Sequence, residues 1–150
     1  MTSTGAAPFR LVRRKSSYTD LADDDASCRL MNLCDTANLD SFEAVCDVVK
    51  DKSSAIVKEI HAKNKLLVSN GHTTVFAPPE PEQGDDHGNL VLRTFSESVD
   101  ESEQTVMTRE FMVHLEQGNK VEVRERRKSK ASDGTFEYNE MQKIIDLANN

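Results

Sequence analysis

The sequence has no tryptophan and only two tyrosines and six phenylalanines among its 150 residues, so a hydrophobic core has to rest on Val, Ile, Leu and Met. It also lacks any apolar run near the ~18 residues that cross a bilayer, and its N-terminus has no hydrophobic signal-peptide segment. We therefore expect a cytoplasmic or nuclear protein without a transmembrane segment. The length favours a single domain.

Cysteine is also scarce. The chain has three cysteines, an odd number, and none of them has C-x-x-C spacing. All three fall in segments with a helical pattern, which favours buried reduced thiols over disulfides or zinc ligands. These residues are Cys28, Cys34 and Cys46.

Motifs of catalysis are missing as well. The sequence contains no G-x-S-x-G, P-loop, G-x-G-x-x-G or H-E-x-x-H pattern. Asp85, Asp86 and His87 are adjacent, but neighbouring carboxylates do not form a preorganised metal site, and we interpret them as part of a solvated loop. We predict no catalytic residue, cofactor or metal and favour a non-enzymatic function, while leaving an enzyme open.

Charge is unevenly distributed along the chain. The net charge of −7 argues against wholesale binding to nucleic acid. Residues 1–18 nevertheless contain basic side chains and no acidic residue before Asp20, mixed with Ser, Thr and Gly. We predict that 1–18 is a disordered basic tail and that 19–150 forms one α+β domain.

The strongest periodic signal lies in residues 40–64. Five apolar residues fall on one stripe of a 3.6-residue helix, namely Phe42, Val45, Val49, Ile56 and Ile60. Asp40 is the expected N-cap and Glu43 its capping-box partner. A shorter helix is predicted ahead of it from the spacing of Leu21, Leu30, Leu33 and Leu39. The shorter helix is expected to pack against the long one, whose apolar stripe is expected to be core.

The rest of the chain reads mainly as antiparallel strands. Asn70-Gly71 predicts a hairpin with strands at 65–69 and 72–77, and an alternative leaves 65–68 on the long helix. A strand is expected at 89–95 and a mobile loop at 96–104. The clearest hairpin follows, with one wet face, because apolar residues alternate on both sides of a Gln-Gly-Asn turn, namely Phe111, Val113, Leu115, Val121 and Val123.

The C-terminal segment completes the predicted architecture. Phe136 and Tyr138 indicate a last short strand, and Asn139 is a plausible cap for a terminal helix that carries Met141, Ile144, Ile145 and Ala148. The sequence thus predicts an α+β fold with two N-terminal helices, a curved antiparallel sheet of about four to five strands and a short C-terminal helix.

The pattern Arg-Arg-Lys-Ser occurs twice, at 13–16 and 126–129. It resembles the substrates of basophilic kinases such as the cyclic-AMP-dependent family, in which an acidic cleft pairs with guanidinium groups before the accepting hydroxyl. The resemblance implies a basophilic kinase as a partner and phosphorylation at Ser16, Ser17 and Ser129. A phosphate of about −1.5 to −2 charges on the tail could dock or release it.

Basic residues also crowd the predicted strand after the Gln-Gly-Asn turn. Glu122 and Glu125 interrupt them, and no aromatic residue is interleaved to stack on bases. We therefore favour a solvated face or a protein-binding patch over a phosphate-binding surface for RNA. The patch comprises Lys120, Arg124, Arg126, Arg127 and Lys128.

One further segment resembles a partner-binding helix. Leu30, Leu33, Cys34 and Asp35 are similar to the core of a BH3 helix, in which apolar anchors enter a groove and the Asp meets an Arg. We favour a structural amphipathic helix and keep Leu30, Leu33 and Asp35 as a candidate partner helix.

The favoured function is therefore a non-enzymatic intracellular protein-interaction or adaptor module with a phosphorylatable basic tail, whose partner is another protein. A homodimer is left open. One alternative is a small-ligand or lipid-binding protein, or an enzyme, with a cavity between the sheet and the long helix, which His114 could line. The other is an RNA-associated factor that uses the basic strand end.

Overall fold

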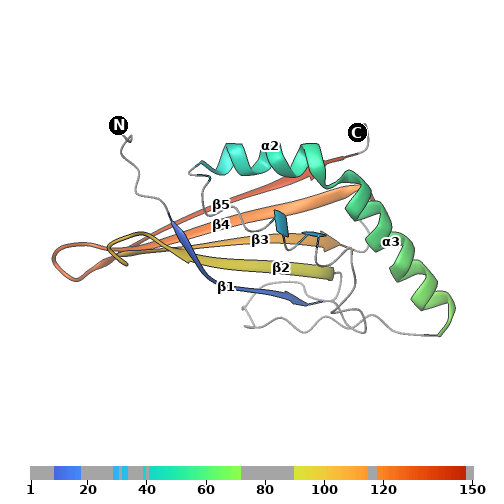
Figure 1. The fold of residues 1–150 in the computed structure, drawn as a ribbon, viewed down its shortest axis with the longest axis horizontal. Helices are drawn as coiled ribbons and strands as arrows, with labels where there is room; N and C mark the ends of the chain where they lie inside the picture. Colours follow the sequence, from blue (N-terminus) through green and yellow to red (C-terminus); the bar gives the residue numbers. More distant parts are fainter. Residues whose placement is uncertain are drawn as a thin grey trace.

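The fold is α+β, with two helices and a five-stranded antiparallel sheet (Figure 1). The computed structural model describes residues 9–17, 29–30, 32–33, 39, 41–71, 90–114 and 118–147. The predicted α+β class and the antiparallel sheet are confirmed.

The strands follow one another in the sheet in the order in which they occur in the sequence. Neighbouring strands pair antiparallel throughout, and the pairing of β3 with β4 confirms the predicted hairpin at the Gln-Gly-Asn turn. Short connections suffice between antiparallel neighbours, whereas the long connection from β1 to β2 carries both helices. The strands are β1 (Arg10–Ser17), β2 (Leu90–Val99), β3 (Thr105–His114), β4 (Lys120–Lys130) and β5 (Phe136–Asp146).

The long predicted helix is present as two helices, α2 (Phe42–Lys52) and α3 (Ser54–Ser69). Ser41 rather than Asp40 is the N-cap, and its hydroxyl accepts a hydrogen bond from the Ala44 N–H at 3.0 Å. The two helices meet at Ser53, whose hydroxyl donates to the Val49 carbonyl at 2.6 Å. Such back-bonding by serine competes with the helical ladder and bends helices, which accounts for the junction here.

The apolar stripe of the helices packs against one face of the sheet. Buried Val45, Val49, Ile56 and Ile60 share a core cluster with sheet residues. The sheet contributes mainly residues that point to the same face, namely Leu92, Phe111, Val113, Val121, Val123 and Ile145. The prediction that the stripe is core is therefore confirmed. We call this side of the sheet the helix face and the opposite side the open face.

The predicted C-terminal helix is wrong, because residues 136–146 form strand β5 along the whole length of β4. Ile145 and Leu147 are buried two residues apart, as in a strand, whereas Ile144 between them is 49% exposed. The backbone ladder with β4 overrides the weak helical spacing of the apolar residues.

Two other segments expected to be irregular also belong to the sheet. Residues 10–17 form edge strand β1 instead of a disordered tail, because they pair with residues 93–99 of β2. β2 extends to Val99, so 96–99 is strand where a loop was predicted. Both segments are polar, and they become ordered by pairing with a neighbouring strand, which amino-acid composition does not reveal.

The turn predicted at Asn70-Gly71 is not the first hairpin. Residues 65–69 complete α3, as the alternative interpretation had them, and Gly71 has a φ of 88° just after the helix end. The predicted strand at 72–77 lies outside the described residues. In the shorter predicted helix, residues 29–30 and 32–33 have helical backbone, Leu30 is buried in the core and Leu33 packs against it.

Candidate functional site

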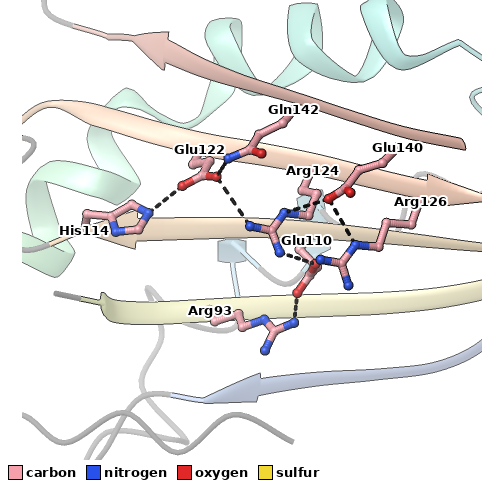
Figure 2. A network of polar contacts seen from close by, with 8 residues as sticks. All are labelled: Arg93, Glu110, His114, Glu122, Arg124, Arg126, Glu140 and Gln142. Carbon is pink, nitrogen blue, oxygen red and sulfur yellow. Dashed lines mark hydrogen bonds and ion pairs between the residues drawn. The ribbon is translucent and has the colours of Figure 1, made fainter. Parts of the chain in front are cut away.

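Strand alternation gathers a network of charged side chains on the open face of the sheet. Residues two apart on a strand point to the same face, and the register brings Phe95, Glu110, Arg124 and Gln142 into one row across β2 to β5. We call the resulting set the charged network (Figure 2). Its members are Arg93, Glu110, His114, Glu122, Arg124, Arg126, Glu140 and Gln142.

Arg124 lies at the centre of the charged network. Its guanidinium nitrogens lie 3.7 Å from Glu110 Oε1, 3.8 Å from Glu122 Oε2 and 3.5 Å from Glu140 Oε2. Arg93 pairs with the other oxygen of Glu110. Three arginines and three glutamates thus balance one another (Figure 2).

Burial makes this balance necessary. The side chain of Glu110 is fully buried and that of Arg93 is 2% exposed. A buried charge loses its hydration and is tolerated only when paired and hydrogen-bonded. The open face is therefore not the wet face that the alternating pattern predicted, because Glu110, Glu122 and Arg124 are all buried.

His114 lies at one end of the charged network. Its Nε2 is 2.7 Å from Glu122 Oε1, and Gln142 donates to the other oxygen of Glu122. The hydrogen bond from His114 lowers the pKa of Glu122 below its ordinary value, against the opposing effect of burial. The imidazole is committed to this carboxylate, so the idea that His114 lines a ligand cavity under the long helix gains no support: alternation places it on the open face.

A second buried ion pair lies on the helix face. Arg109 Nε donates to Glu125 Oε1 at 2.7 Å, and Arg127 Nε donates to the other oxygen at 3.0 Å. Arg109 and Glu125 are directly opposite each other on β3 and β4, with side chains 1% and 0% exposed. Both faces of the β3–β4 hairpin therefore carry buried charge.

The structure divides the predicted interaction patch. Lys120 is exposed at the start of β4, whereas Arg124 is buried in the charged network. Alternation puts Arg127 on the helix face and Arg126 and Lys128 on the open face. Of the five basic residues, Arg126 and Lys128 remain together at one end of β4.

Aromatic residues join the basic ones at this end. Lys128 Nζ lies 4.4 Å from the centroid of the Phe136 ring and 5.8 Å from that of Tyr138, and the two rings are 6.5 Å apart. These are cation–π distances. Phe136 and Tyr138 are 49% and 72% exposed. The sequence carried a signal for this contact, since a hairpin at Asp133-Gly134 puts both aromatic residues opposite Lys130 and Lys128.

A hollow of about 360 Å³ lies beside these residues on the open face. Its polar lining residues include Thr108 and Arg126, and Arg126 Nε lies 3.2 Å from Glu140 Oε2. We call the hollow together with Phe136 the distal surface, because the β4–β5 hairpin extends past both helices here (Figure 1). The lining residues are Val106, Thr108, Arg126, Arg127, Lys128, Tyr138, Asn139 and Glu140.

The predicted phosphorylation sites lie in two different strands. Ser16 and Ser17 end edge strand β1, upstream of which Arg13 pairs with Glu97 at 3.3 Å. Ser129 lies in β4, an interior strand, and its hydroxyl is 3.1 Å from that of Thr105. A kinase that reads an extended peptide reaches β1 by separating one ladder, whereas Ser129 requires β4 to leave two neighbours.

The remaining predicted sites give no support for catalysis. Cys46 is buried, and its burial raises the pKa of the thiol, which keeps it protonated and unreactive. In the described part of the chain, no three His, Cys, Asp or Glu side chains are grouped to hold a metal ion. Four of these residues lie outside the described part of the chain, namely Asp35 of the candidate partner helix, Asp85, Asp86 and His87. Leu30 belongs to the core and Leu33 packs against it.

Comparison with family models, curated proteins and solved structures finds no match to this chain. Among the described helices, none is long and apolar enough to cross a membrane. The function therefore has to be argued from the geometry alone.

Proposed function

We propose that this protein is a non-enzymatic interaction module that binds another protein through its distal surface. The observation that carries the proposal is the exposure of Phe136 and Tyr138 beside Lys128 at the end of the β4–β5 hairpin. Aromatic and cationic side chains are enriched among the residues that dominate binding energy at interfaces. The rest of the described apolar surface includes no second aromatic pair of this exposure.

The charge of the distal surface suggests an acidic partner. Three cations, Arg126, Arg127 and Lys128, line the hollow with one carboxylate, Glu140. Arg127 is paired with buried Glu125 and Arg126 with Glu140, so Lys128 is the cation of the hollow that no carboxylate of the described residues neutralises. This local positive charge stands out in a chain of net charge −7. Complementary potentials steer association and select partners.

We include strand β1, which carries Ser16 and Ser17, in the proposal as a regulator of partner binding. A phosphate at Ser16 or Ser17 adds about −1.5 to −2 charges to β1. β1 is held by Arg10–Glu103 and Arg13–Glu97 ion pairs and is the edge farthest from β5. The Phe9 ring, next to β1 in the sequence, lies 5.2 Å from the guanidinium of Arg127, which lines the hollow, so a change in β1 pairing would reach the distal surface through this contact. A cytoplasmic or nuclear location stays a prediction.

An RNA-associated function is the second candidate. The sequence around the basic residues has no interleaved aromatic residue, but the fold brings the rings of Phe136 and Tyr138 beside Lys128, and this supports RNA binding more than the sequence alone did. Exposed aromatic residues stack on bases and cations contact phosphates in single-strand binders. Glu137 and Glu140 on the same strand oppose a polyanion, and this charge pattern ranks RNA below an acidic protein.

The proposal is tested with a double variant and a matched control. Lys128→Glu/Tyr138→Ser removes the cation and the most exposed ring, whereas Lys58→Glu/Leu66→Ser makes the same kind of change on α3, where Leu66 is 61% exposed. Each tagged protein is used to recover partners from cells of the source organism, quantified by mass spectrometry. We expect protein partners that are lost at least ~10-fold with the first variant and retained by the control.

Two results would count against the proposal. If both variants recover the same partners as the unchanged chain, the distal surface is not the interface. If the recovered material is RNA, and purified protein binds single-stranded RNA with a salt dependence that the first variant abolishes, the second candidate replaces the first.

A further inference from the structure

Strand β5 is an edge strand of the sheet, and α2 lies beside it (Figure 1). It is the last strand in the order and pairs with β4 over Phe136–Asp146. Nine of its eleven residues are exposed, with Met141 half-buried and Ile145 buried. An edge of this length is a template for pairing with another strand, and natural proteins usually protect it with charges.

The charges on β5 are arranged symmetrically in an unusual way. Glu137 and Lys143 lie three residues before and three residues after Glu140, with opposite signs. In the described part of the chain, neither Glu137 nor Lys143 takes part in an ion pair. Lys143 lines a hollow with Glu43 and Asp47 of α2 without pairing to them. Both charges are therefore available to a strand that comes alongside.

The central residue Glu140 is already neutralised within its own chain. Its Oε2 lies 3.2 Å from Arg126 Nε and 3.5 Å from Arg124 Nε (Figure 2). Two copies of Glu140 can therefore face each other with less repulsion than two unpaired carboxylates. Two exposed apolar residues, Phe136 and Ile144, lie four positions on either side and are each 49% exposed.

These features match when β5 meets a second β5 antiparallel, with Glu140 opposite its own copy. Glu137 then lies opposite Lys143 on the helix face, twice by symmetry. Phe136 lies opposite Ile144 on the open face, since directly opposed residues share a face. A shift of two residues in either direction brings Glu137 opposite Met141 or Ile145 and loses both ion pairs. The register is thus specified by charge and by apolar contact together.

We infer that β5 pairs with β5 of a second copy of this chain, joining two sheets into one continuous sheet across a two-fold axis at Glu140. Such an interface is isologous, because each copy contributes the same self-complementary strand. The axis is perpendicular to the sheet, so the two distal surfaces lie on the same face of the dimer. The inference shares Phe136 with the proposed function, but it is tested on purified protein without any partner, so each can fail separately.

Charge reversal tests the register. We expect the purified full chain to have twice the chain mass by light scattering at high concentration. Glu137→Lys or Lys143→Glu replaces two attractive pairs by two repulsive ones and should weaken self-association by about tenfold or more. The double variant Glu137→Lys/Lys143→Glu restores the pairs and should restore the dimer. Glu101→Lys and Lys58→Glu, exposed residues outside β5, are the controls and should leave it unchanged.

Crosslinking tests the axis. A residue opposite its own copy has a Cα–Cα distance of about 4.5–5.5 Å, within the roughly 4.4–6.8 Å range of disulfides. Glu140→Cys should therefore form an intermolecular disulfide between its two copies under mild oxidation, identified by peptide mass. Glu137→Cys and Gln142→Cys face other residues and should not. The unchanged chain is oxidised in parallel to account for Cys28, Cys34 and Cys46.

The possible outcomes decide the inference. A monomer at every accessible concentration overturns it, and so does a dimer that the single charge reversals leave intact. A dimer that the single variants weaken and the double variant restores supports it. Folding of each variant is checked by its urea midpoint, so loss of association is separated from loss of structure.

Discussion

Replacing Arg109 by Met should destabilise the protein through the carboxylate that it leaves behind. Arg109 and Glu125 lie opposite each other on β3 and β4, the two strands of the hairpin, and both side chains are buried. Breaking a buried pair by removing one partner costs about 3–5 kcal/mol. Arg127 still donates to Glu125 at 3.0 Å, so we expect the lower end, ~3 kcal/mol.

Urea unfolding followed by circular dichroism measures this loss. In a separate thermal unfolding experiment, the melting temperature should fall by about 6–12 °C, because 1 kcal/mol corresponds to ~2–4 °C for a chain of this size. The double variant Arg109→Met/Glu125→Met removes both charges and fills the space with apolar atoms, so it should regain most of the stability. Glu125→Met alone leaves Arg109 buried and should be as harmful as Arg109→Met.

The comparison of these variants separates pairing from packing. If Arg109→Met costs less than ~1 kcal/mol, the buried carboxylate finds another way to be neutralised and the burial argument is wrong. If the double variant is as unstable as the single one, the loss comes from the shape of the side chains. If the loss of unfolding free energy in the double variant equals the sum of the losses in the two single variants, Arg109 and Glu125 do not stabilise the fold through their pairing.

Three further predictions concern the helices and the kinase sites. Val49→Asp puts a charge into the core and should unfold the domain, seen as loss of the urea transition; a folded variant that no longer associates would make the helix the interface. Burial lowers the pKa of His61 below 6.5, so the unfolded chain binds more protons and the urea midpoint should drop as pH falls below about 6.5, whereas His61→Gln should flatten this slope. A basophilic kinase should phosphorylate Ser129 in the native protein at least ~1,000-fold more slowly than in a free peptide of residues 122–134. In the native protein, Ser16 in β1 should be phosphorylated faster than Ser129. Equal rates at Ser129 in protein and peptide would refute the protection of Ser129 by strand β4.

The core of the fold could be predicted from the sequence where apolar spacing was strong. Val45, Val49 and Ile60 gave a helical period, and the alternation around Phe111 and Val123 gave a hairpin; both are confirmed. The break at Ser53 escaped prediction because a serine inside a helix signals a bend only through its hydrogen bond to Val49.

The edges of the sheet could not be predicted in the same way. β5 buries few side chains, and the described side chains of β1, at 10–13, are exposed. The order of both strands comes from ladders with β2 and β4, and the β1–β2 ladder joins residues far apart in the sequence. Tyr138 shows the consequence for the site. The aromatic ring that completes the distal surface is ten residues from Lys128 in the sequence and lies opposite it on the neighbouring strand.

The buried charges explain what apolar alternation leaves undecided, namely which of several registers β3 and β4 adopt. A slip of two residues keeps every side chain on its face, so the apolar pattern tolerates it. One slip would bring Arg109 opposite Arg127, and the other would bring Glu110 opposite Glu122. The observed register instead opposes Arg109 to Glu125 and Glu110 to Arg124.

Like charges that face each other in a buried strand pair are strongly unfavourable, so these residues exclude the neighbouring registers even if they add little net stability. The same reasoning extends to edge strand β5. Glu137 and Lys143 on β5 oppose each other in only one symmetric pairing, and this makes an edge that repels most strands selective for its own copy. Inside the sheet the observed register opposes unlike charges, and at its edge we infer the same rule, which charge reversal tests.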